Sequence, residues 1–188
     1  MRGYFGIGVE RISKTMNMGN LFRSANAFGA SFVFTVAASY KRKEGAKSDT
    51  SDALAHLPFY SFPKPASLVL PDGCKLIGVE LMEDSVELPS FHHPAQAAYI
   101  LGPERGQLSC GLAARCDWVV KIPTQFCINV GIAGAIVMYD RLVSLGRYPR
   151  RAERPGPPTE KLSAHQHGGT FSRAGKLMEA YLDKPPRP

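Results

Sequence analysis

The segment YFGIGVERISKTMNMGNLFRSANAFGASFVFTV, residues 4–36, decides the fold that this sequence predicts. Residues 4–9 form a short apolar run that is typical of a buried strand, and residues 31–36 form a second such run. The residues between the two runs have the periodicity of a helix. The segment therefore predicts a strand, a helix and another strand in succession.

The periodicity of the helix is carried by Leu21, Ala25 and Phe28, which fall at positions i, i+4 and i+7. This spacing places them on one apolar stripe. Asn17 would cap the start of the helix, and Gly29 would end it. The helix would thus bury one side against the two strands.

Further strands and helices alternate along the chain. Residues 75–80, 98–101 and 118–122 have the composition of strands, and residues 108–115 have that of a helix. Residues 40–52 form a polar loop. Strands that alternate with helices predict an α/β fold with a parallel sheet.

The segment INVGIAGAIVMYDRLVSL, residues 128–145, predicts a strongly apolar helix. Gly131, Gly134 and Ala135 would allow another backbone to approach it closely. Because apolar residues occur all round this helix, we expect it to be covered on more than one side.

The composition changes at Pro149, so we divide the chain into a domain, 1–148, and a tail, 149–188. The tail holds 7 of the 15 prolines, with 8 basic and 4 acidic side chains. Such a composition predicts a mostly extended basic tail, with a short helix near residues 174–182.

The composition excludes wholesale disorder, because 44% of the 188 residues are hydrophobic and 21% are charged. A net charge of +7 suits a polyanion such as nucleic acid, but it also suits many other basic proteins. The N-terminal residues lack the apolar run of a signal peptide, and no apolar run is long enough to span a membrane. We expect a soluble cytoplasmic protein that does not bind membranes.

The cysteines and histidines do not predict a metal site. The four cysteines lack CxxC pairing and close Cys/His spacing, so we expect reduced and mostly buried thiols. His92 and His93 fall in an expected loop, where solvated side chains are commoner than ligands.

Three segments follow predicted strands, where α/β proteins build their sites. The first, 17–29, carries the polar residues Asn20 and Arg23 on an otherwise apolar helix. The second, 99–109, ends a strand at Gly102, Pro103, Glu104, Arg105 and Gly106, where backbone groups can approach a ligand. The third, 119–142, turns through a proline-containing loop to a helix that Asn129 would cap. Neither GxGxxG nor a P-loop pattern occurs.

The order and content of these segments resemble the three motifs of the SpoU/TrmH family of RNA ribose 2′-O-methyltransferases, within the SPOUT superfamily. The first motif is matched by Asn17, Gly19, Asn20, Arg23, Ala25, Phe28 and Gly29. The second is matched by Gly102, Glu104 and Gly106, and the third by Ile122, Pro123 and Asn129. Cys127 stands where the family has serine, and the loop before it is shorter than usual. The resemblance spans about residues 3–145.

The resemblance implies a parallel-sheet SPOUT fold with a deep C-terminal trefoil knot, although knots are otherwise nearly absent from proteins. It implies S-adenosylmethionine as cofactor, no metal, and a homodimer that buries the helix beginning at Asn129. The cofactor would lie against Leu101, Gly102, Pro103, Gly106, Ile122, Pro123, Cys127 and Ile128.

The resemblance also implies the catalytic residues. Arg23 would have the central role, either as the base or, because guanidinium rarely loses its proton, by fixing a phosphate and stabilising the developing alkoxide. Asn20 and Asn129 would position Arg23 or the ribose, and Glu104 would orient or neutralise arginine. Candidate RNA contacts are Lys41, Arg42, Lys43 and Arg105, and the tail.

Transfer RNA is favoured over ribosomal RNA as the substrate, because this short chain is similar in layout to compact tRNA enzymes. Two alternatives stay open. The chain would modify a base, as other SPOUT branches do, or it would be a non-catalytic RNA-binding protein of the same fold, an alternative that the replacement at Cys127 keeps open.

Overall fold

The computed structural model describes residues 3–39, 56–146, 148–149 and 151–158. The chain divides into two compact units, Met1–Arg147 and Tyr148–Pro188. The described residues of the second unit contain neither a helix nor a strand. The predicted loop cations Lys41, Arg42 and Lys43, and the predicted helix at 174–182, lie outside the described residues.

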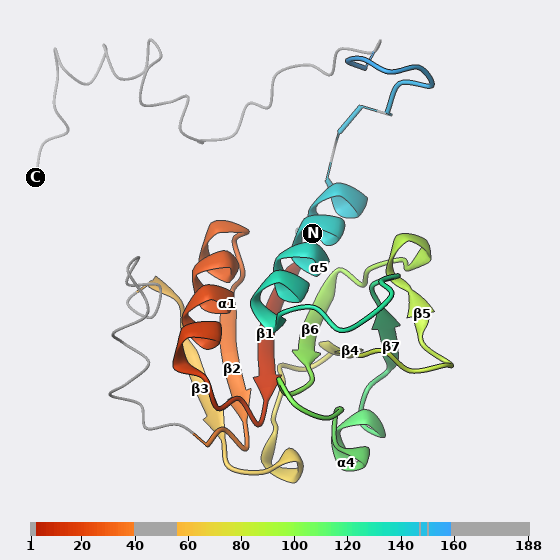
Figure 1. The fold of residues 1–188 in the computed structure, drawn as a ribbon. Coiled ribbons are helices and arrows are strands. Elements are labelled where there is room, and N and C mark those ends of the chain that lie inside the picture. The colour runs from red at the N-terminus through yellow and green to blue at the C-terminus, as the bar shows by residue number, and fades with distance from the viewer. Residues whose placement is uncertain (1–2, 40–55, 147, 150, 159–188) are drawn as a thin grey trace, which may run out of the picture. The chain divides into compact units, whose positions relative to one another are not determined.

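The first unit is built on a parallel sheet with the strand order β3-β2-β1-β6-β4-β7-β5 (Figure 1). Every neighbouring pair of these strands is parallel, which confirms the predicted α/β class. The strands are β1 (Tyr4–Glu10), β2 (Phe32–Val36), β3 (Phe59–Phe62), β4 (Lys75–Val79), β5 (Val86–Glu87), β6 (Gln96–Leu101) and β7 (Trp118–Lys121). The helices within the described residues are α1 (Thr15–Ala27), α4 (Cys110–Ala113) and α5 (Val130–Leu145), with short 3-10 helices at Pro65–Ser67 and Leu88–Ser90. The trefoil knot stays a prediction.

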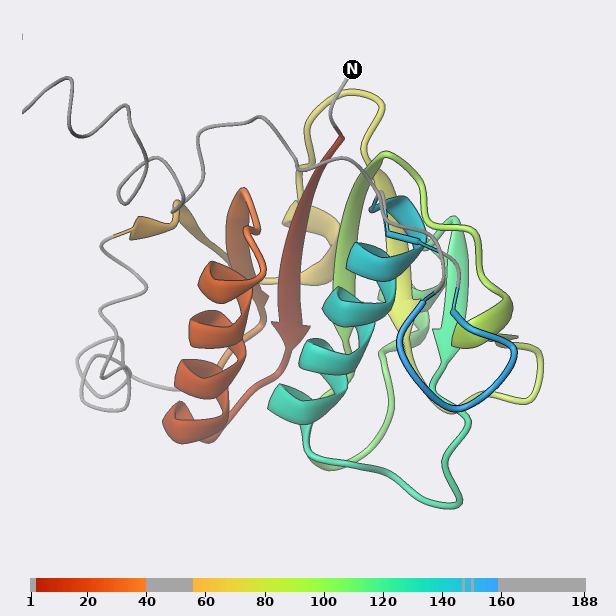
Figure 2. The same cartoon turned by 90° about the horizontal axis from the view of Figure 1, so that it is seen from above.

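The sheet separates two hydrophobic cores. Along the central strand β6, Tyr99 and Leu101 belong to one core, while Ala98 and Ile100 belong to the other. This alternation follows from the two-residue period of a strand. Figure 2 shows α1 and α5 side by side on one face of the sheet, where their buried residues complete the first core. The second core includes Leu112 of α4.

Close packing between α1 and α5 depends on a small residue. A Cβ atom added at Gly134 would lie 2.2 Å from Cδ1 of Leu21, which is completely buried. The close approach predicted from the small residues of this helix is therefore present at Gly134. The opposite flank of α5 is not covered within the described chain, since Ile132 is 57% exposed and Tyr139 is 53% exposed. The expectation that this helix is covered on more than one side therefore stays a prediction for that flank.

The first turn of α1 begins earlier than the sequence predicted. Lys14 is the N-cap residue, and its carbonyl accepts hydrogen bonds from the backbone N–H groups of Asn17 and Met18. Asn17 thus lies inside the first turn and is not the cap, so its side chain can bond to other segments. Gly29, with a φ of 75°, follows the end of the helix as expected.

His93 is buried, which corrects the expectation of a solvated loop histidine. Its ring contacts the Tyr99 hydroxyl at 2.5 Å and Asp140 at 2.9 Å. Burial lowers the pKa of His93 and raises the pKa of Tyr99 to about 12. The guanidinium of Arg141 also donates to the Tyr99 hydroxyl and to backbone carbonyls of Tyr4, Pro94 and Ala95. These bonds join α5 to the start of β1 and β6.

The thiols are less buried than predicted. Cys110 and Cys127 are exposed and Cys74 and Cys116 are half-buried, because all four lie at element ends or in loops and not on the sheet faces. All four are free thiols. Among the described residues, no group of histidine, cysteine and acidic side chains is suited to hold a metal ion. In the same part of the chain, none of the helices has the length and apolar character of a membrane span.

Candidate active site

A slot opens at the carboxyl edge of the sheet, where the loops after β4, β6 and β7 meet. These strands are neighbours in the sheet, so their following loops converge at one place, as expected for an α/β fold. The lining residues are Val79, Glu80, Leu81, Leu101, Gly102, Pro103, Glu104, Gly106, Ile122, Thr124, Cys127, Ile128, Val130 and Ala133. The slot is therefore formed mainly by turns and apolar side chains.

The turn after β6 is held in place by two carboxylates. The Oε2 atom of Glu80 accepts a hydrogen bond from the backbone N–H of Leu108 at 2.9 Å. Glu10, which is 1% exposed, accepts one from the backbone N–H of Ser109 at 2.7 Å. A Cβ atom at Gly102 would lie 2.3 Å from Oε2 of Glu80, so any larger residue there would displace this carboxylate. The exposed backbone of this turn can thus face a ligand directly.

The structure places all but one of the predicted cofactor residues in this slot. Leu101, Gly102, Pro103, Gly106, Ile122, Cys127 and Ile128 line it. Pro123 does not line it, because the chain turns sharply there, with the N–H of Thr124 donating to the carbonyl of Ile122 at 2.7 Å. Glu104, predicted as a catalytic residue, also lines the slot.

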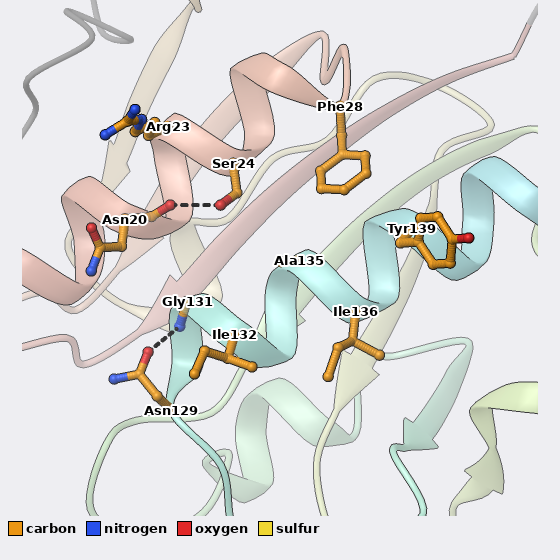
Figure 3. Close-up of a pocket in the computed structure, with 10 residues that line it drawn as sticks. All are labelled: Asn20, Arg23, Ser24, Phe28, Asn129, Gly131, Ile132, Ala135, Ile136 and Tyr139. Carbon is orange, nitrogen blue, oxygen red and sulfur yellow. Dashed lines mark hydrogen bonds between the residues drawn. The ribbon is translucent and has the colours of Figure 1, made fainter.

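The other predicted catalytic residues line a separate groove between α1 and α5, drawn in Figure 3. Asn20 and Arg23 come from α1, and Asn129 stands at the start of α5. All three are exposed. The remaining lining residues are Ser24, Phe28, Gly131, Ile132, Ala135, Ile136 and Tyr139. One wall of the groove is thus polar and the other is the uncovered apolar flank of α5.

Asn17 joins the slot to the groove. Its Nδ2 donates to a carboxylate oxygen of Glu104, and its Oδ1 accepts from Nδ2 of Asn129 at 3.0 Å. Ser13 donates to the other oxygen of Glu104 at 2.9 Å. The side chain of Asn129 also caps α5 by accepting from the N–H of Gly131 at 2.8 Å, as predicted. The bonds of Asn17 therefore connect all three of the motif segments.

Sequence reasoning missed Asn17 as a site residue, as well as Glu80, Glu10 and Ser13. Asn17 was among the matched motif positions, but it was expected only to cap the helix and was given no role in the site. Glu80 and Glu10 each stand at or directly after the end of a strand, which is a signal that could have found them. Arg105, predicted to contact RNA, is exposed on the turn after β6.

The sequence of this chain is similar to a known family and to part of a larger protein. The SpoU rRNA Methylase family matches residues 5–139. The tRNA (guanosine(18)-2′-O)-methyltransferase TARBP1 of Mus musculus is 27% identical over 138 residues, which is 69% of this chain and 9% of that protein. This chain therefore spans only a small part of that relative.

Two solved structures share the fold. The SpoU methyltransferase AviRb from Streptomyces viridochromogenes, crystallised with AdoMet, has a TM-score of 0.66 at 22% identity, covering 76% of this chain and 61% of that chain. A structure described as explaining 2-OH methylation of C/U34 on tRNA has a TM-score of 0.65 at 20% identity, covering 76% of this chain and 91% of that chain. A relative of the same fold thus binds the cofactor that the sequence predicted. With most of its first unit matched by the family, this chain belongs to the SpoU rRNA Methylase family.

Proposed function

We propose that this protein transfers a methyl group from S-adenosylmethionine to a ribose 2′-oxygen of an RNA, with tRNA as the favoured substrate. The observation that carries the proposal is the connection of two sites through Asn17. A slot of backbone turns lies on one side, and a groove with the exposed Arg23 lies on the other. One site would hold the donor, and the other would receive the RNA.

The slot fits the proposed cofactor. Its lining is mostly apolar, and glycine at position 102 leaves backbone groups open, as in many small-molecule sites. When bound, S-adenosylmethionine supplies a methyl group on a positively charged sulfur. Leu101, Ile122 and Ile128 would hold its apolar parts and exclude water.

Arg23 would act on the acceptor side of the reaction. Guanidinium keeps its proton at neutral pH, so Arg23 is suited to fix an RNA phosphate and to stabilise negative charge on the 2′-oxygen as it attacks the methyl carbon. In a balanced transfer the methyl carbon would leave sulfur as it joined that oxygen, and the proton of the hydroxyl would pass to solvent or to a nearby acceptor. Asn20 and Asn129, in the same groove, would orient the ribose.

The bonds around Glu104 would hold the slot and the groove in a fixed position relative to each other. Its two oxygens accept from Ser13 and Asn17, so the carboxylate is fixed next to both the donor slot and the amide that reaches Asn129. Proper orientation of two reactants supplies a large share of the rate in such displacements. Glu104 would thus act as a positioning group.

Two relatives favour tRNA as the substrate. TARBP1 is described as a tRNA 2′-O-methyltransferase, and the C/U34 structure concerns tRNA. The same comparisons favour the ribose over a base as the acceptor. The basic loop at 41–43, Arg105 and the 149–188 tail are proposed to contact phosphates, and binding should then weaken with salt.

We also propose that the protein is a homodimer through the uncovered flank of α5. Ile132, Tyr139 and Leu142 are exposed there, and an apolar patch of this kind favours a partner surface. A second copy would cover the flank and complete the groove that Arg23 lines. Analytical ultracentrifugation of the full chain tests this, and a monomer at micromolar concentration would contradict it.

The role of Arg23 is tested with Arg23→Ala and Arg23→Lys. Both variants should bind S-adenosylmethionine as the wild type does, measured by calorimetry, while methyl transfer to RNA falls by about a hundredfold or more in the alanine variant. Lys14→Ala is the matched control, since it removes an exposed cation at the start of the same helix. Normal turnover by Arg23→Ala would refute the assignment.

The alternatives give different results in the same assays. A base-modifying enzyme would leave the label on the base after nuclease digestion and mass spectrometry. A non-catalytic RNA-binding protein would bind RNA without any turnover, whether or not it retained affinity for S-adenosylmethionine.

A further inference from the structure

The charged side chains that line the slot, among the described residues, are acidic. Among the described residues that line it, the carboxyl side chains are those of Glu80 and Glu104, and no lysine, arginine or histidine takes part. In the described part of the chain, no cation forms an ion pair with either of them. The slot therefore presents negative charge to whatever it binds.

The two carboxylates are not equivalent. The oxygens of Glu104 accept from the side chains of Ser13 and Asn17, which tie them to α1 and the segment before it. Among the described residues, the donors to the carboxylate oxygens of Glu80 are the backbone N–H groups of Leu81 and Leu108, both at 2.9 Å. Each carboxylate oxygen can accept about two hydrogen bonds, so Glu80 keeps capacity for a ligand.

The position of Glu80 is fixed by its surroundings. Its two backbone donors come from different loops, after β4 and after β6, and therefore hold the carboxylate at the meeting point of the two. Gly102 has no side chain to cover Oε2, which a Cβ atom at that position would approach to 2.3 Å. A charge held in place in this way needs no reorganisation when a ligand binds.

We propose that Glu80 makes the slot selective for the positively charged donor, S-adenosylmethionine, over its neutral thioether product, S-adenosylhomocysteine. The proposal rests on the proposed function. The two ligands differ by one methyl group and one positive charge at sulfur, so a fixed carboxylate in a partly dry slot distinguishes them by charge. This preference would favour release of the product after each transfer.

The test is the ratio of the dissociation constants of S-adenosylhomocysteine and S-adenosylmethionine, both measured by calorimetry on the full chain. Glu80→Gln keeps the shape and removes the charge, and it should lower this ratio by about fivefold. Glu83→Gln is the matched control, because it removes the same charge from an exposed residue three positions away that does not line the slot. Its ratio should equal that of the wild type.

Other outcomes would overturn the proposal. If Glu80 only holds the turn after β6, Glu80→Gln weakens the binding of both ligands equally, and the ratio of the two dissociation constants does not change. Should that variant fail to fold, the wild type decides with sinefungin, which carries a positively charged amine where S-adenosylmethionine carries the sulfonium methyl. A charge-based preference should make sinefungin bind more tightly than S-adenosylhomocysteine, and equal dissociation constants would overturn the proposal.

The failure of this proposal can be told from failure of the proposed function. Binding of both ligands by the wild type, with methyl transfer to RNA and an unchanged ratio in Glu80→Gln, would overturn the role of Glu80 alone. A wild type that binds neither ligand would overturn both proposals.

Discussion

At the scale of single residues, the site is organised by side chains that connect segments far apart in the sequence. Asn17 bonds to Glu104, 87 positions away, and to Asn129, 112 positions away. Its amide offers a donor to the carboxylate and an acceptor to the other amide, a combination that aspartate, of the same size but without a donor when ionised, does not provide. The identity of Asn17 therefore matters more than its place in a helix.

Replacing Asn17 by aspartate tests this connection. The Asn17→Asp variant would face the carboxylate of Glu104 with a second carboxylate and would lose the N–H donor, so Glu104 and the turn behind it should shift. We expect methyl transfer to fall by about tenfold to a hundredfold, with a smaller effect on protein stability. Steady-state kinetics and thermal unfolding measure the two effects.

Asn26→Asp makes the same change near the end of α1, away from both the slot and the groove, and serves as the control. Equal activity of the Asn17→Asp and Asn26→Asp variants would contradict the role of Asn17.

Sequence patterns predicted the residues of the slot better than the bonds between them. A glycine after an apolar strand indicates a turn that a ligand can approach, which marked Gly102 as a candidate, and the family resemblance then implied the other residues of the slot. The sequence could not show that Lys14 begins α1, because lysine is no usual cap, and Asn17 was therefore assigned to capping. Hydrogen bonds across 87 and 112 positions leave no local pattern.

At the scale of elements, the contact between α1 and α5 positions both walls of the groove. Leu21 of α1 packs where Gly134 of α5 has no side chain. Apolar periodicity predicted both of these helices and the strands β1, β2, β4, β6 and β7. It missed β3 and β5, since β3 has two exposed residues in the middle and β5 has only two residues.

Gly134→Leu should destabilise the protein. The new side chain would meet Leu21 in a completely buried region, and overpacking of this kind costs about 1–3 kcal/mol. Urea unfolding followed by circular dichroism gives the difference in the free energy of unfolding. Gly111→Leu is the control, because nothing lies within 4 Å of a Cβ atom there. Similar losses for both variants would contradict a specific contact at Gly134.

At the scale of the whole molecule, a buried polar cluster joins the far end of α5 to the sheet. His93, Tyr99, Asp140 and Arg141 bond to one another or to the backbone at the start of β1 and β6. The sequence did not predict this cluster. A histidine between aromatic and proline residues is typical of a loop, and only the folded chain brings it against Tyr99 and Asp140.

The cluster predicts how stability depends on pH. Burial lowers the pKa of His93, and the opposing effect of Asp140 is smaller. The unfolded chain therefore binds a proton on this histidine at a pH where the folded chain does not. Stability from the neutral ring is present above the unfolded pKa of about 6.5 and is lost as the pH falls below it toward the folded pKa.

His93→Gln should remove that part of the pH dependence. The variant should have a lower free energy of unfolding than the wild type at pH 8, because it loses the packing and bonds of a buried ring. This difference between the two proteins should narrow toward pH 5. Chemical denaturation at several pH values measures the difference. A difference in unfolding free energy that widens as the pH falls would mean that His93 is protonated in the folded protein.

The central claim is that this chain places the donor methyl beside an RNA ribose, with Arg23 on the acceptor side. The most direct test incubates the purified protein with small RNA and S-adenosylmethionine that carries a deuterated methyl group, and then identifies the labelled nucleosides by mass spectrometry. We predict label on the 2′-oxygen of one nucleoside, lost in Arg23→Ala. Label on a base, or no label from a protein that binds both cofactor and RNA, would contradict the claim.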